Sequence, residues 1–295
     1  MKNIHGIFAV TVTHFNNDGS IDYGAISNHL KWLLKSGVHG IIPIGATGEW
    51  PSLSTDERKE IAEFIMKEVN GQVPVIVGAI STSVNETVDL STHAASLGAD
   101  GVMILPPPGV HLSQNEIYEF YKYVSGATTL PVMVYNNPGS SGVVVEADTL
   151  SRCAQLPRMA FLKESSGDIM RLTRSVDEVG DKLVVFCGCE SLAYESFVMG
   201  AKAWVCVLGN IAPAMCVALY DLIVNQGKLD EARAVYRQML PLLRLIEESG
   251  ELWQVVKHSL LLKGFGTGSL RMPRQPISES VRVELEKILK RTEFK

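Results

Sequence analysis

Eight short apolar segments, all before residue 208, constrain the fold of this chain more than any other feature. They span residues 7–12, 40–44, 75–80, 101–105, 132–135, 160–163, 183–187 and 203–207. Most are nearly continuous runs of apolar residues, as expected for strands that are covered on both faces. Amphipathic segments lie between them, and two begin with capping boxes, Ser54 with Glu57 and Ser113 with Glu116. The chain is therefore predicted to alternate strands with helices.

Three of these strands are preceded by the same helix-to-strand connection. Gly37, Gly98 and Gly200 each close a helical stretch and are followed within a few residues by an apolar strand. Glycine favours the left-handed conformation that ends many helices, so this join is typical of a repeated β/α unit. Eight such units predict an α/β fold, the closed (β/α)8 or TIM barrel. An open doubly wound sheet is the alternative, but it usually has fewer strands and a glycine-rich first turn, which the stretch FAVTVTHF lacks.

From residue 213 onward the strand pattern is replaced by helical spacing. The apolar positions that follow this spacing are Val235, Met239, Leu242, Leu243 and Ile246, and later Val281, Leu285, Ile288 and Leu289. Pro241 falls inside the first set and predicts a kink there. No linker rich in Pro, Gly or Ser separates the two parts. We therefore expect a barrel over residues 1–212 and a C-terminal helical extension over 213–295 that packs on it as one structural unit.

Composition excludes several classes of partner. The net charge of -5 provides no basic surface, so no nucleic-acid partner is expected. No apolar run approaches the roughly 20 residues that span a bilayer, and residues 1–6 contain no apolar signal core. Five cysteines without a secretory signal fit reduced thiols. We expect a cytoplasmic protein that has no membrane partner.

Two side chains that can move protons end neighbouring predicted strands. Tyr135 ends the strand at 132–135, and Lys163 ends the strand at 160–163. In a β/α barrel the carboxyl ends of the strands surround one mouth, where the chemistry takes place. A lysine that burial deprives of water gives up its proton more readily, and a neutral amine forms an imine with a ketone. A tyrosine within reach supplies the proton donor and acceptor that this chemistry requires.

A third feature opens toward the same mouth. The segment Gly45-Ala-Thr-Gly-Glu49 follows the second strand, and Gly45, Thr47 and Gly48 offer backbone N–H groups and a hydroxyl to a small carboxylate. Each feature alone has an ordinary explanation: a solvated lysine, a rim aromatic or a simple turn. Their agreement on one mouth indicates a 2-keto acid that is held as a Schiff base.

Other patterns do not indicate a metal or a cofactor. Cys187 and Cys189 have no matching His or Cys set nearby, so core thiols are expected rather than metal ligands. The stretch GFGTG at 264–268 follows a helical segment and is interpreted as a connecting turn rather than a dinucleotide loop. The loops after strands seven and eight lack a glycine-rich phosphate site, so the substrate is expected to be unphosphorylated. Glu190 is a candidate for contacts with substrate hydroxyls, with a solvated carboxylate as the alternative. Ser165 and Ser166 are candidates for contacts with a substrate tail or for a helix cap.

The chain also resembles a known family, that of dihydrodipicolinate synthase and N-acetylneuraminate lyase, over nearly its whole length. The motifs that carry the resemblance are GATGEWPSLSTDER at 45–58, YNNP at 135–138, KESSGD at 163–168, GAKAWV at 200–205, NIAP at 210–213 and GSLRMPRQP at 268–276. The resemblance implies a (β/α)8 barrel with C-terminal helices and a homotetramer, a dimer of dimers. For the site it implies that Lys163 forms the imine, Tyr135 shuttles protons, Thr47 binds the substrate carboxylate and Val205 lines the pocket.

Three departures from the dihydrodipicolinate synthases bear on the reaction. Ala46 stands where those enzymes have a hydroxyl residue, and the stretch near Pro108 lacks the tyrosine of their proton relay. Ser140 occupies the position of the arginine that binds their second substrate. These losses favour a family member that acts on one keto acid, derived from a sugar or from hydroxyproline, by retro-aldol cleavage or by loss of water or ammonia.

Two rival hypotheses stay open. The first is a genuine 4-hydroxy-tetrahydrodipicolinate synthase, which condenses pyruvate with aspartate semialdehyde and in which water or Thr13 replaces the lost hydroxyls. The second is a barrel that binds keto acids without turning them over. The presence of both Lys163 and Tyr135 disfavours a pure binder, because binding alone does not require an imine-forming lysine.

Overall fold

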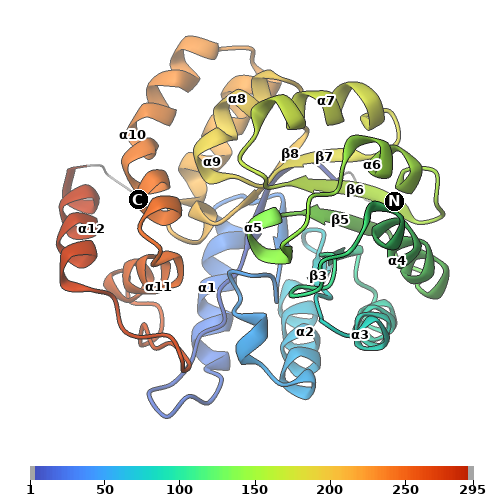
Figure 1. The fold of residues 1–295 in the computed structure, drawn as a ribbon. Helices are drawn as coiled ribbons and strands as arrows, with labels where there is room; N and C mark the ends of the chain where they lie inside the picture. The colour runs from blue at the N-terminus through green and yellow to red at the C-terminus, as the bar shows by residue number, and fades with distance from the viewer. Residues whose placement is uncertain (1–3, 292–295) are drawn as a thin grey trace.

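Eight parallel strands form the centre of the computed structural model, which describes residues 4–291 (Figure 1). All eight predicted strands are present, with ends that differ from the prediction by at most two residues. They are β1 (Gly6–Val10), β2 (Gly40–Ile42), β3 (Ile76–Gly78), β4 (Gly101–Ile104), β5 (Val132–Asn136), β6 (Met159–Glu164), β7 (Val184–Cys187) and β8 (Ala203–Cys206).

The strands close into a barrel. Except for β2 and β3, each strand pairs in parallel with its sequence neighbour, and β1 also pairs with β8, which gives the order β2-β1-β8-β7-β6-β5-β4-β3. The seam between β2 and β3 is closed by a parallel bridge of Ile41 to Val75, in which the Ile41 N–H donates to the Pro74 carbonyl at 3.0 Å. The predicted (β/α)8 barrel is therefore confirmed.

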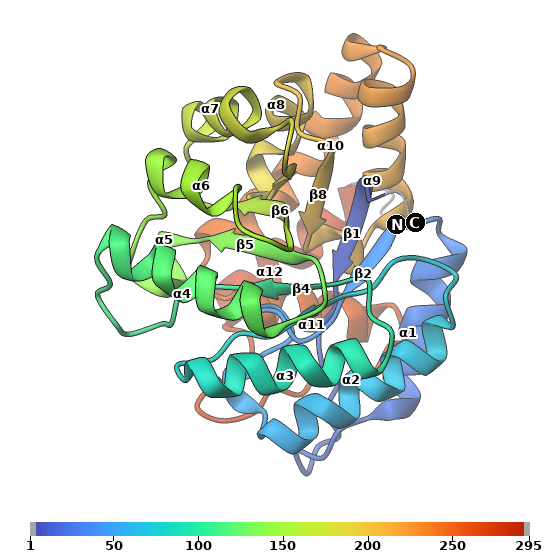
Figure 2. The same cartoon turned by 90° about the vertical axis from the view of Figure 1, so that its right-hand side faces the viewer.

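Helices cover the outside of the barrel (Figure 2). The larger ones are α1 (Tyr23–Lys35), α2 (Thr55–Val69), α3 (Val84–Ser96), α4 (Gln114–Ala127), α6 (Ala147–Cys153), α7 (Ile169–Val179), α8 (Ala193–Val198) and α9 (Pro213–Tyr220). Both predicted capping boxes form, at the start of α2 and of α4. Four short helices interrupt the loops at the carboxyl ends of the strands: η1 (Trp50–Ser52), α5 (Pro138–Ser141), η2 (Glu190–Leu192) and η3 (Leu208–Asn210).

The chain after α9 forms the C-terminal helices. A π-helical turn, η4 (Asp221–Asn225), leads into α10 (Leu229–Glu248), α11 (Leu252–Leu262) and α12 (Glu279–Arg291), which lie on one side of the barrel in Figure 1. The helix α10 includes Pro241 in its interior, and the kink expected there stays a prediction. Its apolar residues Met239, Leu242 and Leu243 are buried, as the helical spacing predicts. Contacts of α10 with η2, and of α11 with η3, bring this extension to the mouth of the barrel.

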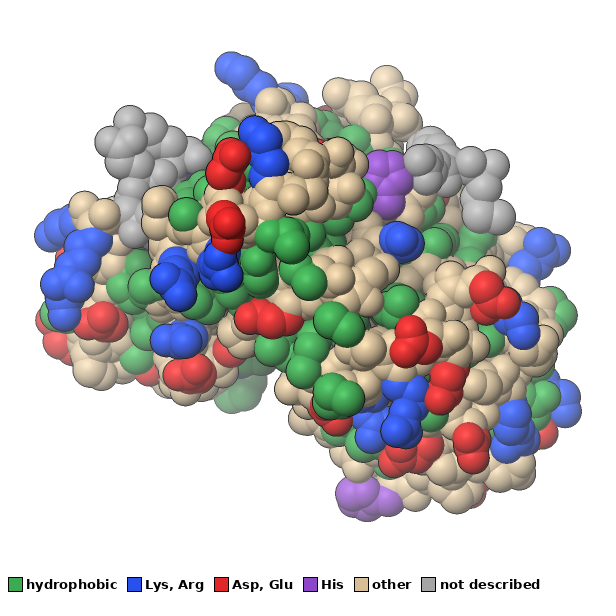
Figure 3. Space-filling view, turned by 90° about the horizontal axis from the view of Figure 1, so that it is seen from above, with side chains coloured by type: hydrophobic (Ala, Val, Ile, Leu, Met, Phe, Trp, Pro, Cys, Tyr) green, Lys and Arg blue, Asp and Glu red, His purple; other side chains and the backbone are tan. Residues whose placement is uncertain are grey.

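The described surface carries mixed charge. Figure 3 shows Lys and Arg side chains mixed with Asp and Glu, with hydrophobic side chains gathered along the middle of that face. None of the helices between residues 4 and 291 is both long enough and apolar enough to cross a membrane.

Candidate active site

Lys163 and Tyr135 meet inside the barrel mouth, as predicted. They lie side by side in the register of β5 and β6, which directs both side chains to the barrel interior. The Lys163 Nζ atom lies 3.9 Å from the centre of the Tyr135 ring. Both residues are buried, with exposed fractions of 6% for Lys163 and 3% for Tyr135. The amine is thus held against an aromatic face rather than in bulk water.

A cavity of about 450 Å³ opens beside these two residues. Segments from five strand ends and from the C-terminal extension form its wall. The lining residues include Ala46, Thr47, Tyr135, Asn137, Lys163, Ser165, Ser166, Gly188, Cys189, Glu190, Val207, Ile246, Glu247, Leu252 and Trp253. Among the described residues of this wall, Lys163 carries the only basic side chain. A ligand with one carboxylate and one carbonyl group suits such a cavity better than a ligand with several anionic groups.

The backbone at Gly188 makes room for Lys163. A Cβ atom placed on Gly188 would lie 1.9 Å from the Ser165 Oγ atom and 2.9 Å from the Lys163 Cγ atom. These distances are far below van der Waals contact, so any larger residue would displace the lysine or the serine. Glycine at this position therefore determines how Lys163 enters the cavity.

Asn137 orients the phenol of Tyr135. Its Nδ2 atom donates to the Tyr135 hydroxyl oxygen at 2.8 Å. Because that oxygen acts as acceptor, the phenolic proton remains free to be donated to another group. The Asn137 Oδ1 atom also accepts from the Ser140 N–H and so caps α5. One side chain thus fixes both the phenol and the loop that follows β5.

The ends of β5 and β6 are joined behind the cavity. Each strand extends one residue beyond the predicted end, to Asn136 and Glu164. The Asn136 Nδ2 atom donates to Glu164 at 2.8 Å, and the other Glu164 oxygen accepts from the Ser166 N–H at 2.8 Å. Burial raises the pKa of Glu164. Since strand residues alternate in direction, these two side chains point away from Tyr135 and Lys163 and hold the loops instead.

The loop after β2 has a strained entry. Ile44, a β-branched residue, has a φ of 60°, and the Ile44 carbonyl lies 2.2 Å from where a Cβ on Gly78 would be. Strain of this kind tends to occur at functional sites. Thr47 is buried and lines the cavity, as predicted.

The backbone of Gly48 differs from the expectation. Its N–H donates to the Gly45 carbonyl at 3.0 Å within the turn, so it is not free to bind a carboxylate. The Gly48 carbonyl accepts from the Thr13 hydroxyl at 2.7 Å. Gly48 therefore shapes the loop: a Cβ there would lie 3.1 Å from both the Ile44 nitrogen and the Thr11 carbonyl oxygen. Of the residues proposed for the carboxylate, Thr47 reaches the cavity wall, together with its neighbour Ala46.

Of four other candidates, two line the cavity and two do not. Val205 is buried in β8 opposite Phe8, and the residue of this segment that lines the cavity is Val207. Ser140 is exposed on α5 and is not part of the cavity wall. Ser165 and Ser166 both line the cavity, and the cap of α7 is instead Asp168.

Glu190 lines the cavity but is engaged by the protein. Its carboxylate accepts from the backbone N–H groups of Val207 at 2.7 Å and Leu208 at 2.8 Å. The indole of Trp204 is a third donor, at 3.2 Å. Burial raises the pKa of Glu190 to about 8, although the two backbone donors act in the opposite direction. These contacts hold the loop after β8 in place, and the role of Glu190 toward a substrate stays a prediction.

The C-terminal extension supplies cavity residues that sequence patterns did not indicate. Ile246 and Glu247 come from the end of α10, and Leu252 and Trp253 begin α11. Helical spacing predicts helices in this part of the chain. It does not predict which end of a helix lies at the barrel mouth. The change from helix to turn at Ser249-Gly250 is the only local signal of this joint.

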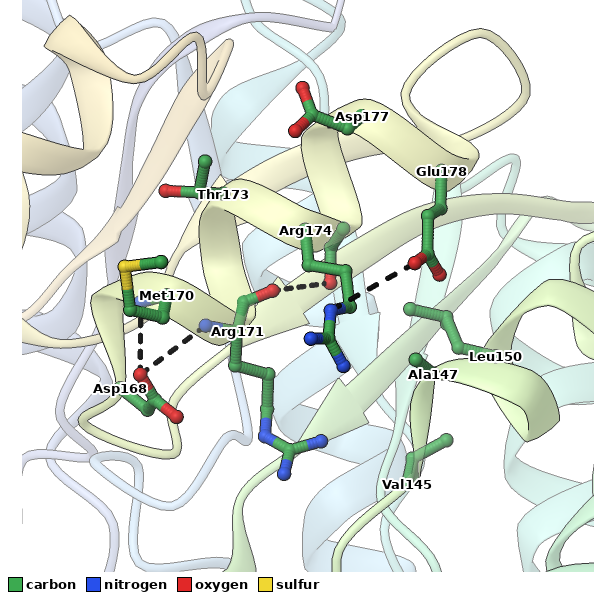
Figure 4. A pocket seen from close by; sticks show the side chains of 11 residues that line it. Val145, Ala147, Leu150, Asp168, Met170, Arg171, Thr173, Arg174, Asp177 and Glu178 are labelled. Atoms are coloured by element: carbon green, nitrogen blue, oxygen red, sulfur yellow. Dashed lines mark hydrogen bonds and ion pairs between the residues drawn. The ribbon is translucent and has the colours of Figure 1, made fainter.

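A second hollow lies outside the barrel, on α6 and α7 (Figure 4). Its volume is about 380 Å³, and charged side chains of α7 line much of it. Arg171 forms an ion pair with Glu146, and Arg174 lies 3.9 Å from Glu178. Because both arginines have acidic partners and neither Lys163 nor Tyr135 is present, this hollow is not the candidate active site.

A closed (β/α)8 barrel with a lysine and a tyrosine buried in its C-terminal mouth is the architecture of a barrel enzyme. The chain matches the model of the dihydrodipicolinate synthetase family over residues 3–292 and belongs to that family, whose members include lyases. The resemblance inferred from the motifs is thereby confirmed.

Individual relatives agree with this assignment. The chain is 32% identical to a 4-hydroxy-tetrahydrodipicolinate synthase of Bacillus velezensis, covering 97% of this chain and 99% of the relative. It is 34% identical to an uncharacterized DapA-like lyase of Halobacterium salinarum, covering 96% of this chain and 92% of the relative. The solved structure of dihydrodipicolinate synthase from Thermotoga maritima is similar, with a TM-score of 0.94, 32% identity and 99% of each chain covered.

Proposed function

We propose that this chain is a lyase that forms an imine between Lys163 and an unphosphorylated 2-keto acid and then breaks a carbon–carbon or carbon–heteroatom bond. The observation that carries the proposal is the buried Lys163 amine against Tyr135, in a cavity wall with no other basic side chain among its described residues. We propose a sugar-derived or hydroxyproline-derived keto acid as the substrate.

The proposed reaction uses the amine as a temporary electron acceptor. The Lys163 nitrogen adds to the keto carbon, C2, and water leaves to give an iminium ion. In a retro-aldol reaction the C4 hydroxyl loses its proton, the C3–C4 bond breaks, the fragment that carries C4 leaves as an aldehyde, and the electrons of the broken bond form an enamine with the iminium. Protonation at C3 and addition of water then release the shortened keto acid and the free amine. Loss of water or ammonia would instead remove a proton from C3 and a leaving group from C4.

Tyr135 is proposed to move the protons in these steps. Its phenol adjoins Lys163, and Asn137 leaves the phenolic proton free. Thr47, at the strained loop after β2, is proposed to bind the substrate carboxylate through its hydroxyl. Val205, Ala46, Gly48 and Ser140 are not required to contact the substrate in this proposal.

Trapping the imine tests the proposal directly. Borohydride reduction in the presence of pyruvate, followed by mass spectrometry of peptides, is expected to place a stable adduct on Lys163. The variant Lys163→Ala should lack both the adduct and any turnover, whereas Lys182→Ala, which removes a lysine from the turn before β7, should retain both. No adduct on Lys163 with pyruvate or with any longer keto acid would contradict the proposal.

The runner-up is synthesis of 4-hydroxy-tetrahydrodipicolinate, the activity named for the Bacillus velezensis relative. The cavity weighs against it, because a second substrate that carries its own carboxylate would meet no basic side chain besides Lys163 among the described residues of the wall. A coupled assay with pyruvate and aspartate semialdehyde distinguishes the two. A keto-acid binder without turnover would form the Lys163 adduct and release every keto acid unchanged.

Family membership also leads us to propose a homotetramer, a dimer of dimers. Sedimentation velocity at micromolar concentration is expected to give the mass of four 32.2 kDa chains. A single species at the mass of one chain would contradict this assembly.

A further inference from the structure

Trp253 connects the C-terminal extension to the loop beside the proposed carboxylate site. It is the second residue of α11, and its side chain lines the same cavity as Lys163 and Tyr135. The indole Nε1–H donates to the Ala46 carbonyl oxygen at 2.9 Å. Ala46 immediately precedes Thr47, so this bond fixes the backbone next to the threonine.

Arg274 packs against the ring of Trp253. The Arg274 guanidinium carbon lies 3.1 Å from the centre of the ring. A stacked guanidinium restricts an aromatic side chain to one orientation. The Arg274 Nε atom also lies 3.8 Å from a carboxylate oxygen of Glu49, at the far end of the same loop.

The loop at residues 45–49 is thus fastened to the extension at both ends. At Ala46 the partner is Trp253, and at Glu49 the partners are Arg274 and the buried Lys257. Positive φ angles flank the loop, 60° at Ile44 and 57° at Glu49. Such backbone conformations persist when surrounding contacts enforce them. The alanine at position 46 has no polar side chain, so its carbonyl oxygen is the group by which the extension can hold it.

The same indole also forms part of the cavity wall. Ile246 and Leu252, from the joint between α10 and α11, contribute further apolar surface. Among the residues of this joint that line the cavity, Glu247 carries the charge, and its carboxylate accepts from the backbone N–H groups of Glu190 and Ser191. An anionic substrate tail would meet this carboxylate without a basic partner, whereas the C–H face of a neutral carbon chain can pack on the indole.

We propose that Trp253 is a positioning and specificity-determining residue. It holds the Ala46 carbonyl so that Thr47 can bind the substrate carboxylate, and its ring selects keto acids with a neutral tail beyond the imine carbon. This inference rests on the proposed imine chemistry at Lys163.

Two variants separate the two roles. Trp253→Phe keeps an apolar ring but removes the donor to Ala46, and it is expected to slow borohydride trapping of pyruvate by roughly five- to tenfold, the worth of one hydrogen bond. Pyruvate has no tail, so this measurement reports positioning. Trp253→Leu removes the ring as well. Its effect on specificity is measured as the ratio of kcat/KM for a six-carbon 3-deoxy-2-keto acid with a neutral tail to kcat/KM for the analogue that ends in a second carboxylate. We expect this ratio to fall by about tenfold.

The controls keep the outcomes distinct. Leu262→Ala changes an exposed residue at the end of the same helix and should match wild type in both measurements. Far-UV circular dichroism and thermal melting establish that each variant is folded. If Trp253→Phe and Trp253→Leu behave like Leu262→Ala, or if they lower only the melting temperature, the proposal is overturned. If wild type itself forms no adduct on Lys163, the proposed function fails, and that result is separate from the variant-to-wild-type ratios.

Discussion

At the residue scale, the position of Lys163 depends on a neighbour without a side chain. The variant Gly188→Ala would place its Cβ 1.9 Å from the Ser165 Oγ atom and 2.8 Å from the Glu164 carbonyl oxygen. We expect it to lose about 1–3 kcal/mol of unfolding free energy through overpacking and to trap pyruvate more slowly than wild type. Urea unfolding and the trapping rate measure the two effects.

A second glycine serves as the control. Gly126 lies in α4, and a Cβ there would have no atom within 4 Å. Gly126→Ala should leave trapping unchanged and raise the unfolding free energy by up to about 1 kcal/mol, because alanine loses less backbone freedom in a helix. Equal behaviour of the two variants would show that the space around Gly188 is not restrictive.

The phenol of Tyr135 should affect turnover more than binding. In Tyr135→Phe the ring that contacts Lys163 remains, but the group proposed to carry protons is lost. We expect kcat to fall by about 10²–10⁴, while the Lys163 adduct still accumulates at long times with borohydride. Tyr123→Phe, at a tyrosine that is 57% exposed, is the matched control. A Tyr135→Phe enzyme with kcat within threefold of wild type would remove Tyr135 from the mechanism.

The sequence allowed prediction of the side chains that approach the cavity from strand ends. Tyr135 and Lys163 end apolar runs and Thr47 lies in the loop after another, so the barrel rule places all three at one mouth. The rule does not say which backbone N–H groups are hydrogen-bonded within a turn, and for that reason the expectation of a free Gly48 N–H was wrong. The expectation for Val205 came from the family resemblance, and the cavity wall contains Val207, which follows β8, in place of Val205.

At the element scale, hydrogen bonds of two buried histidines join the loop after β1, the helix α1 and the loop after β8. The His14 Nε2 atom lies 3.2 Å from His29 Nδ1, and the other His29 nitrogen lies 3.2 Å from the Asn210 carbonyl oxygen. Burial lowers the pKa of His29 to about 4, and burial, then His29, then Lys257 lower that of His14. Both imidazoles are therefore neutral in the folded protein at pH 7.

The buried, neutral His29 predicts that the folded protein loses stability in acid. The pKa of His29 is lower in the folded protein than in the unfolded chain, so the unfolded chain takes up the proton first as the pH falls below about 6.5. The stabilisation is complete above that pH and is lost toward the folded pKa of about 4. Between pH 7.5 and pH 5, wild type should lose about 2 kcal/mol more unfolding free energy than His29→Gln, which cannot titrate. Parallel pH profiles of the two proteins, obtained by urea unfolding, would show that His29 does not contribute.

Apolar runs and capping residues were enough to predict the elements themselves. The eight strands and the capped starts of α2 and α4 depend on local patterns, and the structure contains them all. The short helices η2 and η3 could not be predicted in this way, because their positions depend on distant partners. The η2 turn receives the carboxylate of Glu247 from α10, and η3 begins where Glu190 accepts two backbone N–H groups.

At the scale of the whole molecule, the C-terminal extension contributes part of the wall of the candidate active site. The cavity wall includes residues that lie more than 80 positions after Lys163 in the sequence, from Ile246 to Trp253. A pattern of period 3.6 predicts a helix and its buried face, but docking of that face on the barrel is set by contacts with loops after β2 and β7. We therefore propose that barrel and extension unfold as one unit.

Variants of the ion pair between Lys257 and Glu49 test whether the barrel and the extension unfold together. Both side chains are buried, with exposed fractions of 2% and 0%, and the Lys257 Nζ atom also donates to the Ser269 carbonyl at 2.9 Å. Removing one member leaves a buried charge with too few partners, so Lys257→Met should lose about 3 kcal/mol of unfolding free energy. The double variant Glu49→Gln with Lys257→Met should recover part of that loss, since neither charge remains.

Tryptophan fluorescence and far-UV circular dichroism should report one shared transition in each protein, because the pair joins α11 to the loop after β2. Two transitions in Lys257→Met, one of them at the wild-type midpoint, would show instead that the barrel folds independently of the extension.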